Sequence, residues 1–276
     1  MSDQASKAFA FRALHTRSGA FIIPNPGDAG TAKILTQLGF EALATTSAGL
    51  AFALGRSDGA VTREETLANA KTIVRATSLP VSADLENGFG HAPEKVAETI
   101  QLAAGVGLVG GSIEDATGDR NKPIYDLNLA VERISAAAEA ACVQNIHFTL
   151  TARAENFLHG RPDLDDTIAR LQAFEKAGAD VLYAPGLPSL EAIRQVCAAV
   201  SRPVNVVAGL SGPAFSLKQL ADAGVKRVSV GSALSRAALG AFMRAATEMK
   251  EMGKFDFAGE AVPYAEINKL MKEEAP

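Results

Sequence analysis

Two carboxylates and two glycines follow the short apolar stretch 79–83. Asp84 and Glu86 come directly after this stretch, and Gly88 and Gly90 complete the segment. Glycine adopts backbone angles that other residues avoid, so we expect a buried strand that ends in a tight turn. Strand alternation would place both carboxylates on one face, where their repulsion favours a hard cation such as Mg²⁺. The alternative interpretation is an acidic turn exposed to water.

Charged side chains also end two later apolar stretches of the chain. Glu114 ends the stretch 108–114, and Arg153 ends the stretch 147–153. Carboxylates beside an arginine suit a divalent cation and an anionic substrate, because a guanidinium group holds a carboxylate through two parallel hydrogen bonds. The metal candidates are therefore Asp84, Glu86 and Glu114. The substrate-binding candidates are Arg153 and a set of small or polar residues at expected strand ends: Thr46, Ser47, Gly49, Asn205 and Gly209.

Eight short β-prone stretches alternate with longer helical ones, without any change of composition along the chain. The predicted strands are 20–24, 40–46, 79–84, 108–114, 147–153, 180–184, 203–207 and 225–230. The predicted helices are 27–38, 62–77, 93–104, 126–143, 164–177, 189–200, 216–223 and 233–252, with a loop over 47–59 and a C-terminal helical tail over 253–276. Thr62 and Glu65 have the spacing of a capping box, and Gly39 stands where a left-handed helix cap usually lies.

Eight strand-and-helix units in one uniform chain favour a single (β/α)8 barrel over residues 1–276, since parallel strands joined by helices need both faces covered. A doubly wound open sheet is the alternative. Such a sheet normally has a Gly-x-Gly-x-x-Gly turn after its first strand, and residues 25–30 (NPGDAG) lack that spacing. Active sites of barrels lie where the strands end, which is where the candidate residues stand.

The composition limits the classes of partner. The chain has 276 residues, a net charge of −4 and 47% hydrophobic residues, with no basic cluster of the kind that nucleic-acid binding needs. It has no run of eighteen uncharged apolar residues, so we expect a cytoplasmic protein without a membrane partner. Cys142 and Cys197 lack metal-type spacing and are predicted to be small buried side chains.

The ordered motifs of the chain resemble the isocitrate lyase and phosphoenolpyruvate mutase superfamily. The motifs are 81–90 (VSADLENGFG), 111–115 (GSIED) and 151–153 (TAR), together with 45–49 (TTSAG) and 54–58 (LGRSD). The resemblance extends over about residues 19–252. It implies a barrel, Mg²⁺ or Mn²⁺, and a small 2-oxo acid or related carboxylate. It also implies a homotetramer of dimers that exchange the last barrel helix, 233–252, or the tail beyond it.

The resemblance assigns roles to individual residues. Asp84, Glu86 and Glu114 match the metal-site acids of the superfamily, and Arg153 matches its substrate-binding arginine. Ser47 and Gly49 match contacts to substrate oxygens, and Asp58 matches the aspartate of the second loop.

The sequence departs from the lyases of the superfamily in the loop after the fourth predicted strand. Those lyases carry a flexible lid with a catalytic cysteine, whereas residues 116–125 (ATGDRNKPIY) are short and contain no cysteine. Another loop, 156–163, contains His159 and Arg161. His159 is a candidate for proton transfer as part of a lid, and the alternative is that this loop only caps the next helix.

These observations predict a Mg²⁺-dependent carbon–carbon lyase that acts on a small 2-oxo or 2-hydroxy acid, comparable to an oxaloacetate decarboxylase or a methylisocitrate lyase. A metal-stabilised enolate is the shared chemistry that the resemblance implies. Water, Tyr183 or His159 would donate the proton. The first alternative is C–P bond chemistry, as a phosphonomutase or a phosphonopyruvate hydrolase, in which Asp58 acts on a phosphonate. The second is a barrel that binds a 2-oxo acid without turnover.

Overall fold

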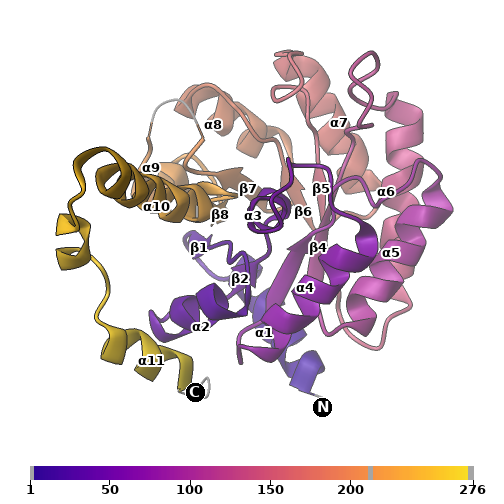
Figure 1. Cartoon of the computed structure of the whole chain (residues 1–276). Coiled ribbons are helices and arrows are strands. Elements are labelled where there is room, and N and C mark those ends of the chain that lie inside the picture. The colour runs from indigo at the N-terminus through magenta and orange to yellow at the C-terminus, as the bar shows by residue number, and fades with distance from the viewer. Residues whose placement is uncertain (1–2, 211–213, 273–276) are drawn as a thin grey trace.

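Eight parallel strands form the centre of the molecule (Figure 1). The computed structural model describes residues 3–210 and 214–272. Neighbouring strands follow the order β1-β8-β7-β6-β5-β4-β3-β2. Their bounds are β1 (Phe21–Ile23), β2 (Leu43–Ala44), β3 (Val81–Asp84), β4 (Gly110–Glu114), β5 (Thr149–Arg153), β6 (Val181–Tyr183), β7 (Val204–Val207) and β8 (Arg227–Ser229). The predicted barrel is confirmed, and every observed strand lies within a predicted stretch.

Asn25 helps to close the barrel between β1 and β2, the two strands that are not paired in the sheet. The backbone N–H of Ala44 donates to the carbonyl oxygen of Pro24 at 3.1 Å, which joins β2 to the end of β1. The buried side chain of Asn25 donates to the carbonyl oxygen of Thr45 at 3.0 Å and accepts from the backbone N–H groups of Val230 and Gly231 at 2.8 and 3.0 Å. One amide therefore connects β1, β2 and β8 at the edge that carries the site.

Helices surround the strands. Their bounds are α1 (Asp3–Thr16), α2 (Ala29–Gln37), α3 (Ser47–Ala53), α4 (Arg63–Arg75), α5 (Pro93–Gly105), α6 (Leu127–Cys142), α7 (Leu164–Lys176), α8 (Leu190–Ala199), α9 (Leu217–Asp222), α10 (Ala233–Met252) and α11 (Tyr264–Lys272), with a 3₁₀ helix η1 (Asp256–Gly259) before α11. The eight predicted helices are confirmed. The capping box of Thr62 and Glu65 is present, and Gly39 has a φ of +84°. The last four residues of the predicted tail lie outside the described residues.

Two helices were not predicted. α1 buries Phe11 and Leu14 in a cluster with Phe21 and Ile23 of β1, so it covers the end of the barrel opposite the candidate residues. A Cβ atom on Gly110 would lie 3.0 Å from the ring of Phe11, which leaves this close packing to glycine. α3 replaces the first half of the predicted loop 47–59. It begins because the Thr46 hydroxyl accepts the backbone N–H of Gly49 at 3.2 Å.

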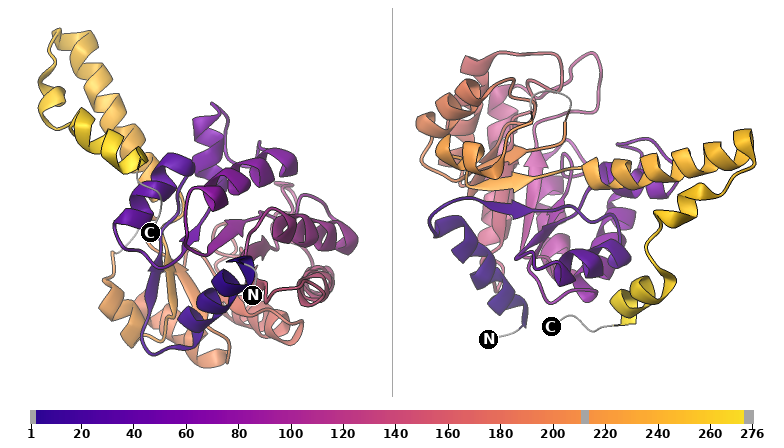
Figure 2. Two further views of the ribbon diagram at one scale, coloured as in Figure 1. Left: turned by 90° about the horizontal axis from the view of Figure 1, so that it is seen from below. Right: turned by 90° about the vertical axis from the view of Figure 1, so that its left-hand side faces the viewer.

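α10 extends away from the barrel, and the tail then turns back so that α11 lies against α2 (Figure 2). The side chains of Lys33 and Gln37 donate to carbonyl oxygens of α11 at 2.7 and 2.8 Å. No residue of α10 is buried.

The prediction for the cysteines is wrong, because Cys142 is exposed at the end of α6 and Cys197 is only half-buried. No helix in the described part of the chain is long and apolar enough to cross a membrane.

Candidate active site

Arg153 stands at the centre of the strand ends. Its Nη1 lies 3.1 Å from Oδ1 of Asp84, its Nη2 lies 3.2 Å from Oε2 of Glu114, and its Nε donates to Oε1 of Glu155 at 2.8 Å. The guanidinium carbon lies 5.0 Å from the centre of the Tyr183 ring. The four strands β3 to β6 therefore bring three carboxylates and one phenol around a single cation, as barrel strand ends are expected to do.

Asp84 is held by contacts from three directions. Its backbone N–H donates to the hydroxyl of Thr45 at 3.0 Å. Its Oδ2 accepts from the Ser47 hydroxyl at 2.9 Å, and its Oδ1 accepts from the backbone N–H of Glu86 at 3.3 Å as well as from Arg153. The first turn of α3 thus places the Ser47 hydroxyl beside the carboxylate of Asp84.

Gly49 fits this turn because it has no side chain. A Cβ atom there would lie 2.5 Å from Cγ2 of Thr46 and 2.6 Å from Oγ of Ser235. Thr46 lines the cavity below Asp84, and Ser47 bonds to the Asp84 carboxylate. Gly49 lines a separate groove beside α10.

Glu86 does not continue the strand, and the expectation from strand alternation is wrong for this residue. β3 ends at Asp84, and Glu86 has a φ of +48°, a left-handed conformation that is strained for a non-glycine residue. The Oε1 atom of Glu86 is buried and has no hydrogen-bond partner among the described residues. Burial and the charges of Asp84 and Asp58 raise the pKa of Glu86 to about 7.

Acidic groups outnumber cations around Arg153. Burial raises the pKa of Glu114 well above its usual value, with further increases from Glu155 and Asp84 and an opposing effect of Arg153. The pKa of Asp58 is also raised, first by desolvation of its carboxyl group and then by the charge of Asp84. Desolvated carboxylates that face one another in this way favour a bound cation.

The remaining predicted residues lie in different places. Tyr183 and Asn205 line the cavity beneath Asp84 and Arg153. His159 is exposed, and its backbone N–H continues a turn by donating to the carbonyl oxygen of Glu155 at 3.2 Å. Asp163 caps α7 by accepting the backbone N–H of Asp166 at 2.9 Å, which agrees with the alternative that this loop starts the helix.

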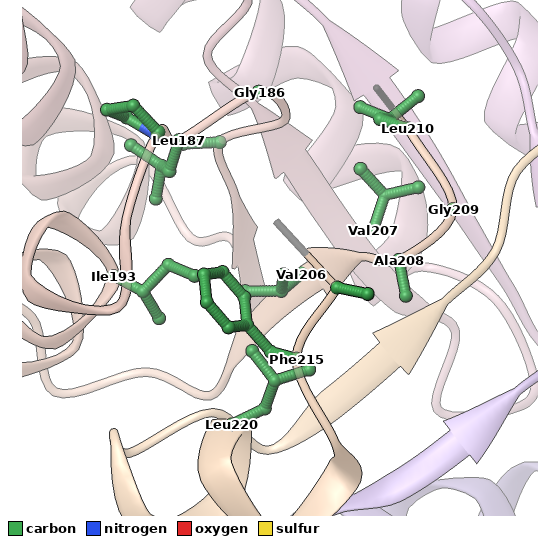
Figure 3. A pocket seen from close by; sticks show the side chains of 13 residues that line it. Gly186, Leu187, Ile193, Val206, Val207, Ala208, Gly209, Leu210, Phe215 and Leu220 are labelled. Carbon is green, nitrogen blue, oxygen red and sulfur yellow. The ribbon is translucent and has the colours of Figure 1, made fainter. Parts of the chain in front are cut away.

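Gly209 borders a separate, apolar pocket of about 360 Å³ (Figure 3). This pocket lies between β6, β7 and the helices α8 and α9, and its lining includes Leu187, Ile193, Val206 and Phe215. Its lining contains no charged side chain in the described part of the chain.

The comparison with known proteins decides the family. A family model described as phosphoenolpyruvate phosphomutase matches residues 11–250. The chain belongs to this family. It is therefore a member of the phosphoenolpyruvate mutase and isocitrate lyase superfamily, as the motifs predicted.

The relatives of this chain are named for several different activities. The 2-methylisocitrate lyase of Escherichia coli (strain K12) is 30% identical over 243 residues, which are 83% of this chain and 81% of that protein. Oxaloacetate decarboxylase 1 of Pseudomonas putida (strain W619) is 28% identical over 238 residues, 84% of this chain and 80% of that protein. A crystal structure from Burkholderia cenocepacia J2315, provisionally described as a lyase or mutase, has 61% identity and a TM-score of 0.97, with 99% of this chain and 98% of that chain covered.

The phosphoenolpyruvate mutase and isocitrate lyase superfamily typically uses Mg²⁺, and the acids of this chain fit that ion. The described residues contain no group of three or more His, Cys, Asp and Glu side chains arranged as a complete ligand set. Mg²⁺ does not require one, because it usually keeps several waters and takes one or two carboxylates. The buried, unpartnered oxygen of Glu86 beside Asp84 is the feature that fits a cation. Asp84 and Glu86 would hold the ion, and Glu114 is the third acid that the sequence predicted for this site.

Arg133 of α6 holds the loop that follows these acids, a role that no pattern in the sequence indicates. It is fully buried and donates to the carbonyl oxygens of Asn87, Gly90 and His91, the last two at 2.6 and 2.5 Å. Its guanidinium carbon lies 4.2 Å from the centre of the Tyr125 ring. Three hydrogen bonds from one cation therefore fix the loop in which Glu86 has its strained backbone.

Arg133→Met is expected to weaken Mn²⁺ binding by about 10- to 100-fold, the usual effect of removing a residue that orients metal ligands. Electron paramagnetic resonance of free Mn²⁺, without substrate, measures this. Ile134→Val lies on the same helix in the core and should cost only about 0.5–1.5 kcal/mol of stability without changing Mn²⁺ affinity. Equal Mn²⁺ affinity in Arg133→Met and the unmodified protein would show that Arg133 stabilises the fold alone.

His15 of α1 and Arg227 of β8 meet at the floor of the barrel. His15 Nδ1 bonds to the carbonyl oxygen of Phe11 at 2.8 Å, so this nitrogen carries the proton, and its Nε2 lies 3.4 Å from Nη1 of Arg227. Burial, followed by the charge of Arg227, lowers the pKa of His15 to about 3.

The free energy of unfolding should therefore fall as the pH decreases below about 6.5, because the unfolded chain then takes up a proton that the folded state excludes. At pH 4.5, two units below the unfolded pKa, the loss from His15 alone is about 2.7 kcal/mol. Urea unfolding at pH 7 and pH 4.5 measures it. His15→Gln should reduce the loss between these pH values, and an unchanged loss would contradict the assignment.

Proposed function

We propose that this protein is a Mg²⁺-dependent carbon–carbon lyase that acts on a small 2-oxo or 2-hydroxy acid. The observation that carries the proposal is the buried, unpartnered carboxylate oxygen of Glu86 beside Asp84, within a group of acids that one arginine does not neutralise. The similarity to a 2-methylisocitrate lyase and to an oxaloacetate decarboxylase supports the same class of reaction.

The bound ion would act as a Lewis acid that stabilises negative charge on the 2-oxo oxygen of the substrate, a contribution of several kcal/mol. Arg153 keeps Asp84 and Glu114 in place and screens their repulsion. Thr46 and Ser47 supply hydroxyl groups at the mouth of the cavity for the remaining substrate oxygens.

Tyr183 is the proposed proton donor of the lyase reaction. Burial raises the pKa of its phenol, so the group keeps its proton at neutral pH, and it lines the cavity beside Arg153. His159 would first have to move in from the surface with its loop. The loop 116–125 is a short hairpin closed by the pairing of Ala116 with Ile124, and it contains no cysteine that could serve as the acid.

The test is the release of pyruvate from oxaloacetate, corrected for the uncatalysed rate, with Mg²⁺ and with a chelator. Release that requires enzyme and disappears with the chelator would support the proposal. No release above background would reject the decarboxylase version, and methylisocitrate would be tested next. Metal-dependent binding without any product would favour the 2-oxo acid binding barrel.

C–P bond chemistry is the second candidate. Asp58 favours it, because its carboxyl group lies close enough to interact electrostatically with Asp84 and Glu86. Turnover of phosphonopyruvate that is lost in Asp58→Ala would establish this candidate and replace the lyase.

A second copy of the chain is proposed to cover α10, which would give the expected helix-exchanged dimers within a tetramer. α10 exposes Leu239, Phe242 and Met243, with Phe242 71% exposed. A groove of about 400 Å³ beside its base is lined by apolar residues of α2 and α3, including Leu35 and Phe52. Apolar patches of this kind mark protein interfaces.

Phe242→Asp is expected to shift the molecular mass in solution from four chains to fewer, as measured by light scattering coupled to size exclusion. The reason is that burying a carboxylate in an apolar interface is unfavourable unless it is paired. Phe9→Asp, which changes an exposed aromatic residue on α1 with a 70% exposed side chain, is the control and should leave the mass unchanged. A single-chain mass for the unmodified protein would contradict the proposal.

A further inference from the structure

The interior of the barrel beneath the acids is lined by small and polar side chains. Barrel interiors are usually filled by bulky Val, Ile and Leu. Here the lining of a cavity of about 60 Å³ includes Ala44, Ser82, Ser112, Asn205 and Ser229. The cavity runs from Thr46 and Asp84 at the mouth down to Arg227. Buried polar groups require hydrogen-bond partners, so a cavity lined in this way suits a polar ligand.

Arg227 is the cation at the floor of this cavity. It is only 5% exposed, and its contacts are to neutral atoms. Its Nε donates to Oδ1 of Asn205 at 2.8 Å, its Nη2 donates to the hydroxyl of Thr151 at 2.9 Å, and its Nη1 lies 3.4 Å from His15. A guanidinium group has five N–H donors, so these contacts leave donor capacity.

No carboxylate pairs with Arg227 in residues 3–210 and 214–272. The ion pairs of the chain include Arg153 and Arg170 but not Arg227. Burial lowers the pKa of Arg227 to about 10, and burial also keeps its neighbour Tyr183 protonated by raising the pKa of the phenol. A buried cation without an anion is unfavourable, and such groups concentrate at functional sites.

Arg153, by contrast, already has anionic partners. Three of its N–H groups are directed to Asp84, Glu114 and Glu155. The positive charge that is free to attract an anion therefore lies deeper, at Arg227.

We infer that Arg227, with Asn205 and Ser229, forms an anion subsite at the floor of the barrel that receives a second carboxylate of the substrate. The substrate would then be a dicarboxylate, with one end at the acids of the mouth and the other at Arg227. The inference rests on the proposed function for the identity of the mouth end. Ser229 is positioned for this role, because its hydroxyl accepts from the Asn205 side chain at 3.1 Å.

The spacing along β5 sets the length of the ligand. Thr151, which contacts Arg227, and Arg153, which contacts the acids, are two residues apart on the same face of the strand. Two residues of a strand rise by roughly 6.6 Å. This distance corresponds to a diacid of about four or five carbons, while a monocarboxylate of the same length would leave Arg227 without an anion.

The test compares two ligands that differ only at the far end, malate and 2-hydroxybutyrate, in which a methyl group replaces the second carboxylate. Isothermal titration calorimetry with Mg²⁺ and full-length protein measures both affinities. A charge-assisted hydrogen bond predicts that malate binds about 10- to 100-fold more tightly. Arg227→Met should abolish this preference while changing the affinity for 2-hydroxybutyrate by less than about threefold.

A second variant keeps the test valid if Arg227→Met does not fold, which circular dichroism would reveal. Arg227→Lys retains the charge but loses the planar fork, so it should lower the malate preference to an intermediate value. Arg170→Lys changes an equally buried arginine outside the cavity and should leave the preference unchanged.

An equal affinity for the two ligands in the unmodified protein, no detectable binding of malate, or a malate preference that survives in both Arg227 variants would each overturn the inference. Its failure is distinguishable from failure of the lyase proposal. Pyruvate release from oxaloacetate with a KM unaffected by Arg227→Met would keep the lyase and reject the subsite. An Arg227-dependent malate preference without any turnover would keep the subsite and reject the lyase.

Discussion

Replacing Asp84 by asparagine is expected to lower the rate of enzyme-dependent pyruvate release by about 10²- to 10³-fold, the usual effect of removing one preorganised electrostatic group. The carboxylate accepts hydrogen bonds from Ser47, Arg153 and the backbone of Glu86. An amide has the same size but no charge, and its NH₂ group would face the N–H groups of Arg153. The variant would therefore lose attraction for the cation and disturb the acids around it.

Steady-state kinetics over a range of Mg²⁺ concentrations measure this effect. If Asp84 holds the ion, the activity of Asp84→Asn should recover only partly at high Mg²⁺. Asp222→Asn is the control, because Asp222 is an exposed carboxylate on α9 that pairs with Lys218, and its activity should stay unchanged. Full activity of Asp84→Asn at low Mg²⁺ would remove Asp84 from the metal site.

Arg153→Met is expected to reduce the free energy of unfolding at pH 7.5 by about 3–5 kcal/mol, as happens when one partner of a buried ion pair is removed. Asp84, Glu114 and Glu155 would lose their common counter-ion. The pKa values of Glu86 and Glu114 are already raised, and they would rise further in the variant. An acid whose folded pKa is raised loses stability as the pH rises through that pKa, so the defect should shrink at pH 5.5.

Chemical denaturation at the two pH values measures the difference. Mg²⁺ should also restore more stability to Arg153→Met than to the unmodified protein, since a cation replaces the lost charge. Arg194→Met removes an exposed pair with Glu191 and should change stability by less than about 1 kcal/mol at both pH values. An equal defect of Arg153→Met at pH 5.5 and 7.5 would show that packing, and not charge, accounts for the loss.

The sequence by itself determined the order of the elements, the barrel and the acids at the ends of β3 and β4. These properties are local, because a β-prone stretch followed by a glycine-rich turn or a helix cap is visible in neighbouring residues. The parallel arrangement then forces the strand ends to one side, which is why Asp84, Glu114 and Arg153 were predicted to meet and do meet.

Local patterns failed where a single element depends on distant parts of the chain. α1 was missed because its packing partners belong to β1 and the barrel floor, and α3 was missed because a hydroxyl at Thr46 starts a helix within a predicted loop. The face of Glu86 was wrong because β3 ends two residues earlier, at Asp84.

The tertiary structure alone decided which charges are neutralised. Arg133 is 43 residues from Gly90, and Arg227 is 76 residues from Thr151 and 212 from His15. No spacing rule connects residues so far apart in the chain, and an arginine in a helix or strand reads as a surface residue until its neighbours are known. Both arginines are inside the barrel, but Arg153 is surrounded by acids and Arg227 has no carboxylate partner among the described residues. The inferred anion subsite depends on this difference.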